Sequence, residues 1–177
     1  MTPRILIAGI GNILLQDDGL GPQAVARLQS EYEFSDGVEL LDIGTPTLDF
    51  VDYLRDREVV ILIDALADGG DPGEILTFDK ERLKTFLPGM RLSAHQPCLR
   101  ETLHAAETAD IHLREVLLIG VVGDHFDVGT DFGPDVSGAV PEVLRLVADH
   151  VRRNGETAEL RTEPLPIQSW WADHRPV

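Results

Sequence analysis

Short apolar runs recur along the chain and are rich in valine, isoleucine and leucine. None of them alternates cleanly with polar residues, which is typical of parallel strands buried on both faces of a sheet. Apolar residues at helical spacing lie between the runs. We therefore predict strands at residues 5–8, 38–41, 59–63 and 116–122, with a further strand at 74–78.

Helical spacing of apolar residues predicts five helices, at residues 22–32, 48–54, 81–86, 99–109 and 141–153. Strands that alternate with helices predict an α/β fold, a three-layer sandwich with a mostly parallel central sheet and helices on both faces. The pattern is lost beyond Gly155, and several prolines follow. We therefore expect a single domain over residues 1–155 and a C-terminal tail over 156–177, either draped on the domain or mobile.

Composition narrows the functional classes. The chain has 177 residues, and 31 acidic against 15 basic residues give a net charge of −16, which disfavours binding to nucleic acid or anionic lipid. No apolar run approaches the roughly 20 residues needed for membrane insertion. Cys98 is the single cysteine, which fits a reducing cytoplasm and is too little for a cysteine-based zinc or iron–sulfur site.

Carboxylates and a histidine follow the predicted strands. Asp17 and Asp18 lie in the loop after the first strand, Asp64 ends the third strand, and His95 precedes the 99–109 helix. Loops after parallel strands meet at one edge of a sheet. Oxygen and imidazole ligands suit nickel or zinc, and few protein ligands leave coordination positions open. Taken singly, each residue is also typical of an ordinary turn or cap, so the metal site depends on their convergence.

The first loop also has features of a dinucleotide-binding motif. Gly9-Ile10-Gly11 follows a strand, and Asp42 ends the next strand as a ribose-binding acid would. The third glycine of that motif would fall at Leu14, however, and two carboxylates in the loop would repel a pyrophosphate. A nucleotide-binding protein is therefore the less favoured alternative.

No nucleophile has a convincing base beside it in the sequence. Cys98 lies three residues after His95, but Pro97 between them makes a productive cysteine–histidine pair unfavourable. His125 is a reserve candidate for the site, because Asp124-His125 follows the end of a predicted strand.

Four groups of residues together resemble the [NiFe]-hydrogenase maturation endopeptidases, which trim the C-terminus of the hydrogenase large subunit after nickel insertion. Residues 9–21 read Gly-Ile-Gly-Asn-x-Leu-x-x-Asp-Asp-Gly-x-Gly, which is far more specific than a lone Gly-x-Gly. Gly44-Thr45, Ile63-Asp64-Ala65 and Ser93-Ala94-His95-Gln96 follow in the family's order and spacing. The similarity covers residues 4–154.

The resemblance implies a site and a substrate. Asp18, Asp64 and His95 would bind the metal, Asp18 or Asp64 would also be catalytic by orienting or deprotonating water, and Gly44 and Thr45 would contact substrate. The nickel would be carried by the hydrogenase large-subunit precursor, whose cysteine thiolates would supply its other ligands, although another divalent metal suits the same residues. The alternative is a non-enzymatic nickel-binding accessory protein that uses these ligands.

Overall fold

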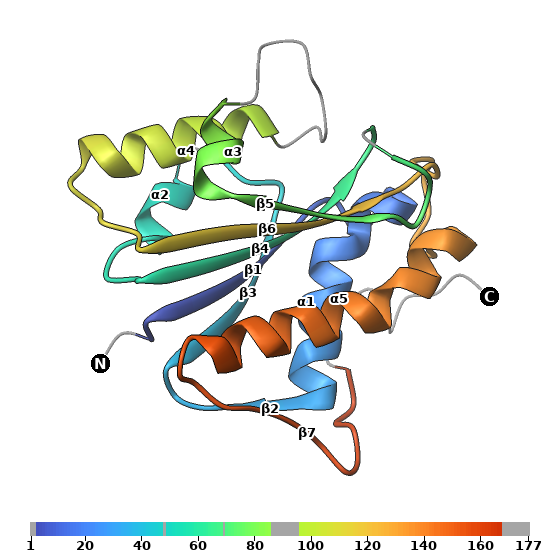
Figure 1. The fold of residues 1–177 in the computed structure, drawn as a ribbon. Helices are drawn as coiled ribbons and strands as arrows, with labels where there is room; N and C mark the ends of the chain where they lie inside the picture. The colour runs from blue at the N-terminus through green and yellow to red at the C-terminus, as the bar shows by residue number, and fades with distance from the viewer. Residues whose placement is uncertain (1–2, 48, 69, 86–95, 168–177) are drawn as a thin grey trace.

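The protein is built around one five-stranded sheet. The computed structural model describes residues 3–47, 49–68, 70–85 and 96–167. All strands of the sheet are parallel except the last, which pairs antiparallel with its neighbour. In spatial order (Figure 1) the strands are β3 (Val38–Gly44), β1 (Ile5–Ile10), β4 (Val59–Leu66), β6 (Glu115–Val122) and β5 (Ile75–Asp79).

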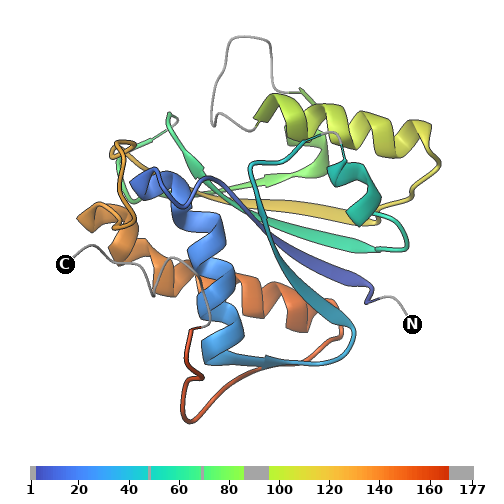
Figure 2. The same ribbon diagram turned by 180° about the vertical axis from the view of Figure 1, so that it is seen from behind.

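Helices cover both faces of this sheet, and the predicted three-layer α/β sandwich is confirmed (Figures 1 and 2). One face is covered by α1 (Leu20–Glu31) and α5 (Pro134–Arg153). The other is covered by α2 (Phe50–Tyr53), α3 (Lys80–Thr85) and α4 (Gln96–Thr108). Each face has its own cluster of buried apolar side chains, which is why the strands lack polar alternation.

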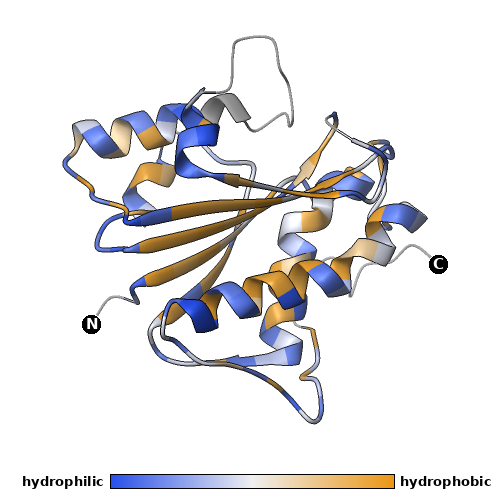
Figure 3. Ribbon diagram, in the orientation of Figure 1, coloured by the Kyte–Doolittle hydropathy of each residue, from blue (hydrophilic) through white to orange (hydrophobic). Residues whose placement is uncertain are grey.

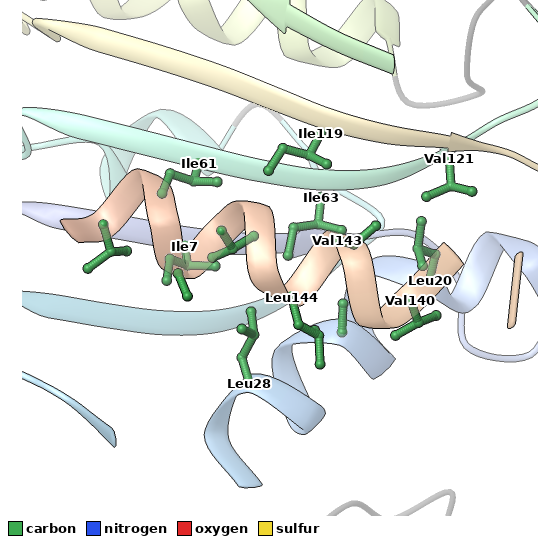
Figure 4. Packing of buried hydrophobic residues seen from close by; sticks show 14 of the residues in the cluster. Ile7, Leu20, Leu28, Ile61, Ile63, Ile119, Val121, Val140, Val143 and Leu144 are labelled. Atoms are coloured by element: carbon green, nitrogen blue, oxygen red, sulfur yellow. The ribbon is translucent and has the colours of Figure 1, made fainter. Parts of the chain in front are cut away.

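Packing of α5 accounts for much of the core on its face. Figure 3 shows hydrophobic residues along the central strands and on the side of α5 that meets them. In the close view of Figure 4, apolar side chains of the helix lie against isoleucines of the sheet. The labelled residues include Val140, Val143 and Leu144 from α5, with Ile61 and Ile63 from β4 and Ile119 from β6.

The prediction that this helix begins at residue 141 is wrong, because α5 already begins at Pro134 and contains Pro141. An internal proline removes one helical hydrogen bond and normally ends or kinks a helix. Here Val136, Ala139 and Val140 are buried and continue the apolar stripe of the second half of the helix. Burial of that stripe outweighs the lost hydrogen bond, and Pro134 at the first turn suits a helix start.

The other predicted elements are present with shifted ends. The first helix begins at Leu20 rather than Pro22 and follows a 3-10 turn, η1 (Gln16–Gly19). The further strand expected at 74–78 is β5, at the edge of the sheet. The three remaining predicted helices correspond to α2, α3 and α4, although residues 48 and 86 lie outside the described ranges.

Two short strands join the segment after residue 155 to the rest of the protein. β2 (Tyr32–Phe34) pairs antiparallel with β7 (Ala158–Leu160) as a separate two-stranded sheet. Farther along, the Leu165 amide donates a hydrogen bond to the Ser30 carbonyl at 2.9 Å. Residues 156–167 are therefore draped on the domain beside α1, and β7 is an element that the sequence pattern does not reveal.

The order of the strands determines where a site can form. From β1 the chain passes through α1 on one face to β3, and from there through α2 on the other face to β4 on the far side of β1. The connections therefore change direction between β1 and β4. In open α/β sheets, ligands bind at the carboxyl ends of the strands at such a switch point. Within the part of the chain that the structure describes, no helix is long and apolar enough to span a bilayer.

Candidate active site at the carboxyl ends of β1 and β4

The glycines of the first loop allow α1 to approach the sheet at very short range. A Cβ atom on Gly21 would lie 2.2 Å from the Ile10 carbonyl oxygen and 2.6 Å from the Ile63 carbonyl oxygen. On Gly9, a Cβ atom would lie 2.3 Å from the Gly21 carbonyl oxygen. These glycines therefore place the start of α1 directly against β1 and β4, and close packing is what the motif requires of them here.

Asp18 is folded back over the exit of β1. Gly11 has a φ of +133°, and a Cβ atom there would lie 1.8 Å from the Asp18 carbonyl oxygen. The amide of Asn12 donates a 2.8 Å hydrogen bond to Asp18 Oδ2. Asp18 is only 7% exposed, and η1, which carries it, contacts β4. The Asp18 carboxylate is thus held at the switch point by backbone contacts.

This geometry also disfavours the dinucleotide interpretation. A nucleotide pyrophosphate binds at a helix N-terminus, where free amides and the helix dipole favour negative charge. In this protein Asp17 and Asp18 are buried immediately before α1. Their carboxylates occupy the position where a phosphate would need neutral or positive surroundings.

Asp64 lies inside β4, and the prediction that the strand ends at this residue is wrong. The strand continues to Leu66, and Asp64 pairs in register with Gly120 of β6. Ala65 and Leu66 are buried apolar residues, which explains the longer strand. Ile63 is the last residue of β4 that pairs with β1, and its partner there is Gly9. Asp64 is the next residue of β4 and is fully buried. It therefore belongs to the same switch point as Asp18.

His95, the third predicted metal ligand, lies outside the described residues, directly before α4 in the sequence. Cys98 belongs to the first turn of α4. That His95 binds the metal, and that His95 and Cys98 do not form a productive pair, therefore both stay predictions.

Gly44 and Thr45, the predicted substrate contacts, adjoin the loop that carries Asp18. The Gly11 amide donates to the Gly44 carbonyl at 3.0 Å, and Gly44 itself has a φ of +61°. Thr45 is exposed and lines a cavity of about 300 Å³ together with Asp42 and Tyr53. Burial raises the pKa of Asp42, and the hydrogen bond that it accepts from the Gly44 amide opposes this rise. Thr45 therefore faces a hollow, and the neighbouring Gly44 is hydrogen-bonded to the loop that carries Asp18.

Asp17 has a structural role that the sequence does not reveal. Its carboxylate is fully buried and accepts three backbone hydrogen bonds, from Asp124 at 3.1 Å, His125 at 3.0 Å and Gly133 at 2.7 Å. These amides belong to the connection between β6 and α5. Asp17 therefore ties η1, and with it the neighbouring Asp18, to a loop distant in the sequence.

His125, the reserve candidate, contacts this same carboxylate. Potential ligand atoms of Asp17, Asp124 and His125 all lie within 4.8 Å of one another, the distance expected of a metal-binding group. Both Asp17 oxygens already accept backbone amides, and His125 Nδ1 contacts Asp124 Oδ1. The three residues are better described as a contact that fixes the loops than as a second metal site.

Comparison with known proteins identifies the family. A family model described as hydrogenase maturation protease matches residues 22–150. The chain belongs to the hydrogenase maturation protease family. The resemblance that the motifs indicate is thereby confirmed, and the protein is a hydrolase of the endopeptidase type.

Relatives of this protease share sequence along most of its length. It is 32% identical over 161 residues to the hydrogenase expression/formation protein HoxM of Azotobacter vinelandii, which covers 90% of this chain and 78% of the relative. It is 33% identical over 167 residues to HupD of Rhizobium leguminosarum bv. viciae, with 94% and 83% covered. The solved structure of the hydrogenase maturating endopeptidase HybD from Escherichia coli superimposes with a TM-score of 0.83 at 28% identity, covering 90% of this chain and 98% of that one.

Substituting Asp17 with asparagine should both destabilise the protease and slow it. The asparagine amide offers one acceptor oxygen in place of two, so at least one buried amide loses its partner. We expect the free energy of unfolding to fall by about 1–3 kcal/mol. Cleavage should slow as well, because Asp18 follows in the same turn.

Denaturant unfolding and a cleavage assay measure the two effects, with the exposed Asp131→Asn variant as the matched control. The free energy of unfolding of this control should lie within about 0.5 kcal/mol of the wild-type value. Wild-type stability in Asp17→Asn would contradict the structural role.

Proposed function

We propose that the protein removes the C-terminal extension of a nickel-loaded [NiFe]-hydrogenase large-subunit precursor, and that it recognises the bound nickel through Asp18, Asp64 and His95. Membership of the hydrogenase maturation protease family supports cleavage of a hydrogenase precursor. One relative, from Escherichia coli, is named as a hydrogenase 2 maturation protease and is 28% identical over 156 residues. Recognition of nickel by these three residues goes beyond what family membership supports.

The observation that carries the proposal is the placement of two buried carboxylates at the switch point. Asp18 is held in η1 by the Asn12 amide, η1 contacts β4, and Asp64 lies within β4. Two carboxylates that different elements place at one point of a sheet edge supply oxygen ligands from separate parts of the chain. Such oxygen ligands suit a divalent cation, which the substrate would bring.

The ligand types fit nickel. Imidazole and carboxylate suit divalent nickel, while thiolates of the precursor would supply its softer ligands. Since the metal would belong to the substrate, cleavage would depend on prior insertion of nickel into the precursor. A metal-free precursor would lack the group that joins it to Asp18, Asp64 and His95.

The chemistry assigned to the chain is water activation. Asp18 or Asp64 accepts a proton from a water molecule as that water attacks the carbonyl carbon of the scissile peptide bond. The leaving amine takes up a proton when the bond breaks. Gly44 and Thr45, beside the 300 Å³ cavity, hold the chain next to the cleaved bond in this proposal. Bound nickel would polarise the carbonyl or the water.

Incubation of purified protein with a nickel-loaded precursor tests the function. Intact-mass measurement should show the precursor replaced by a shorter chain and a released C-terminal peptide. A precursor that keeps its full mass under conditions in which the protein is folded would contradict the proposal.

A further inference from the structure

Two loops at the carboxyl ends of the strands are joined into one surface. They comprise residues 11–18, after β1, and residues 123–133, after β6, and are called the joined loops below. The Gly129 amide donates to the Leu14 carbonyl at 2.9 Å, and the Gln16 amide donates to the Gly129 carbonyl at 2.8 Å. The Asp17 carboxylate adds its three bonds beneath them. Backbone hydrogen bonds therefore fix the shape of this surface.

The joined loops present apolar side chains to solvent. Val128 is 88% exposed, Leu14 is 47% exposed and Phe126 is 36% exposed. Leu15 and Gly129 form a parallel bridge, and this register places Leu14 alongside Val128. Exposed apolar side chains on a fixed backbone, two of them in neighbouring register, are typical of an interaction surface. Their ordered backbone lowers the entropy cost of binding.

Among the described residues, the aspartates of the joined loops have no lysine or arginine beside them in the sequence of the same loops. Asp124, Asp127 and Asp131 of the joined loops are exposed. Neither residues 5–26 nor residues 115–144 contain any lysine or arginine. The loops after β3 and β4 add further acids, among them Asp49 and Asp68, and no basic residue. A partner that covers the joined loops therefore needs an apolar patch surrounded by lysine or arginine.

We propose that the folded body of the hydrogenase precursor docks on the joined loops through Leu14, Phe126 and Val128, with basic residues of the precursor facing the acidic rim. This inference rests on the proposed function and adds a binding surface outside the metal ligands. Continuity with the site favours this occupant, because the joined loops include residues 16–18 of η1, and Asp18 is one of them. A second copy of this chain is disfavoured, since it would bring the same acidic rim against itself.

Docking through this surface predicts an effect on binding rather than on chemistry. The Leu14→Ser/Val128→Ser double variant should raise the KM for nickel-loaded precursor, and its Kd in surface plasmon resonance, by about tenfold or more. Its kcat should stay within about twofold of wild type, because the proposal gives neither side chain a part in the chemical step. Leu160→Ser is the matched control, since Leu160 is 65% exposed on β7. The control should change neither constant.

The acidic rim is tested separately by Asp127→Lys. This variant should slow association with the precursor at low salt and weaken the dependence of the association rate on salt. Glu159→Lys, an equal charge change on β7, should have a smaller effect. Because these variants change exposed side chains, thermal unfolding should match wild type and show that the fold is intact.

The outcomes separate the two proposals. If wild-type protein did not trim the precursor, the proposed function would be contradicted. The Kd values of wild type and the double variant for the precursor would still test the docking surface. Docking would be overturned if the double variant bound precursor with wild-type Kd. It would also be overturned if Leu160→Ser weakened binding equally.

Discussion

Substitution of Asp64 with asparagine should reduce the rate of precursor trimming by about 10²- to 10⁴-fold. Asparagine has nearly the same shape, so it fits the fully buried position within β4. It carries no negative charge and cannot accept the proton of an attacking water molecule at neutral pH. Loss of function without loss of structure is therefore the expected result.

A time course of intact masses gives the trimming rate, and circular dichroism during heating shows whether unfolding stays cooperative. Asp68→Asn is the matched control, since Asp68 is exposed just beyond the end of β4. This control should trim at a rate within about twofold of wild type. Normal trimming by Asp64→Asn would show that Asp64 is only a structural residue.

The second large effect concerns the fold, and it follows from Gly21. An alanine methyl group there would lie 2.2 Å from both the amide nitrogen and the carbonyl oxygen of Ile10. These are backbone atoms, so α1 would have to move away from β1 and β4. We expect the free energy of unfolding to fall by about 3 kcal/mol or more, which is a large part of the stability of a typical domain.

Gly138→Ala is the matched control for this effect. Gly138 lies in α5, and a Cβ atom there would have no neighbour within 4 Å. Since alanine favours the helical conformation more than glycine does, the free energy of unfolding of this variant should rise by up to about 1 kcal/mol. Urea unfolding of both variants measures the difference, and a Gly21→Ala protein as stable as wild type would contradict the close approach of α1.

The central strands could be predicted from sequence because local composition dictates them. Continuous runs of valine, isoleucine and leucine arise where helices cover both faces of a strand, as they do for β1, β4 and β6. The start of α5 could not be predicted from sequence, for the opposite reason. The local effect of Pro141 is overruled by packing of Val136, Ala139 and Val140 against the sheet, which local sequence does not show.

The two strands of the small sheet could not be predicted from sequence. Each has three residues, and their pairing joins positions more than a hundred residues apart, such as Phe34 and Ala158. Such short strands carry too few residues to show a period.

The placement of the two candidate carboxylates could be predicted from sequence, whereas their roles stay predictions. Parallel strands bring the ends of β1 and β4 together, so Asp18 and Asp64 could be assigned to one place from their order in the chain. The resemblance assigns the metal to Asp18, but the structural role of the adjacent Asp17 could not be predicted from sequence. The orientation of Asp17 depends on amides such as that of Asp124, which lies 107 residues away. His95 stays a prediction, because it lies outside the described residues.

The central claim is that nickel held by the precursor is recognised at the carboxyl ends of β1 and β4. The most direct measurement compares nickel-loaded and nickel-free preparations of the same precursor, incubated side by side with wild-type protein and followed by intact mass. We predict that only the nickel-loaded precursor loses its C-terminal extension. Equal trimming of the two preparations would contradict the claim.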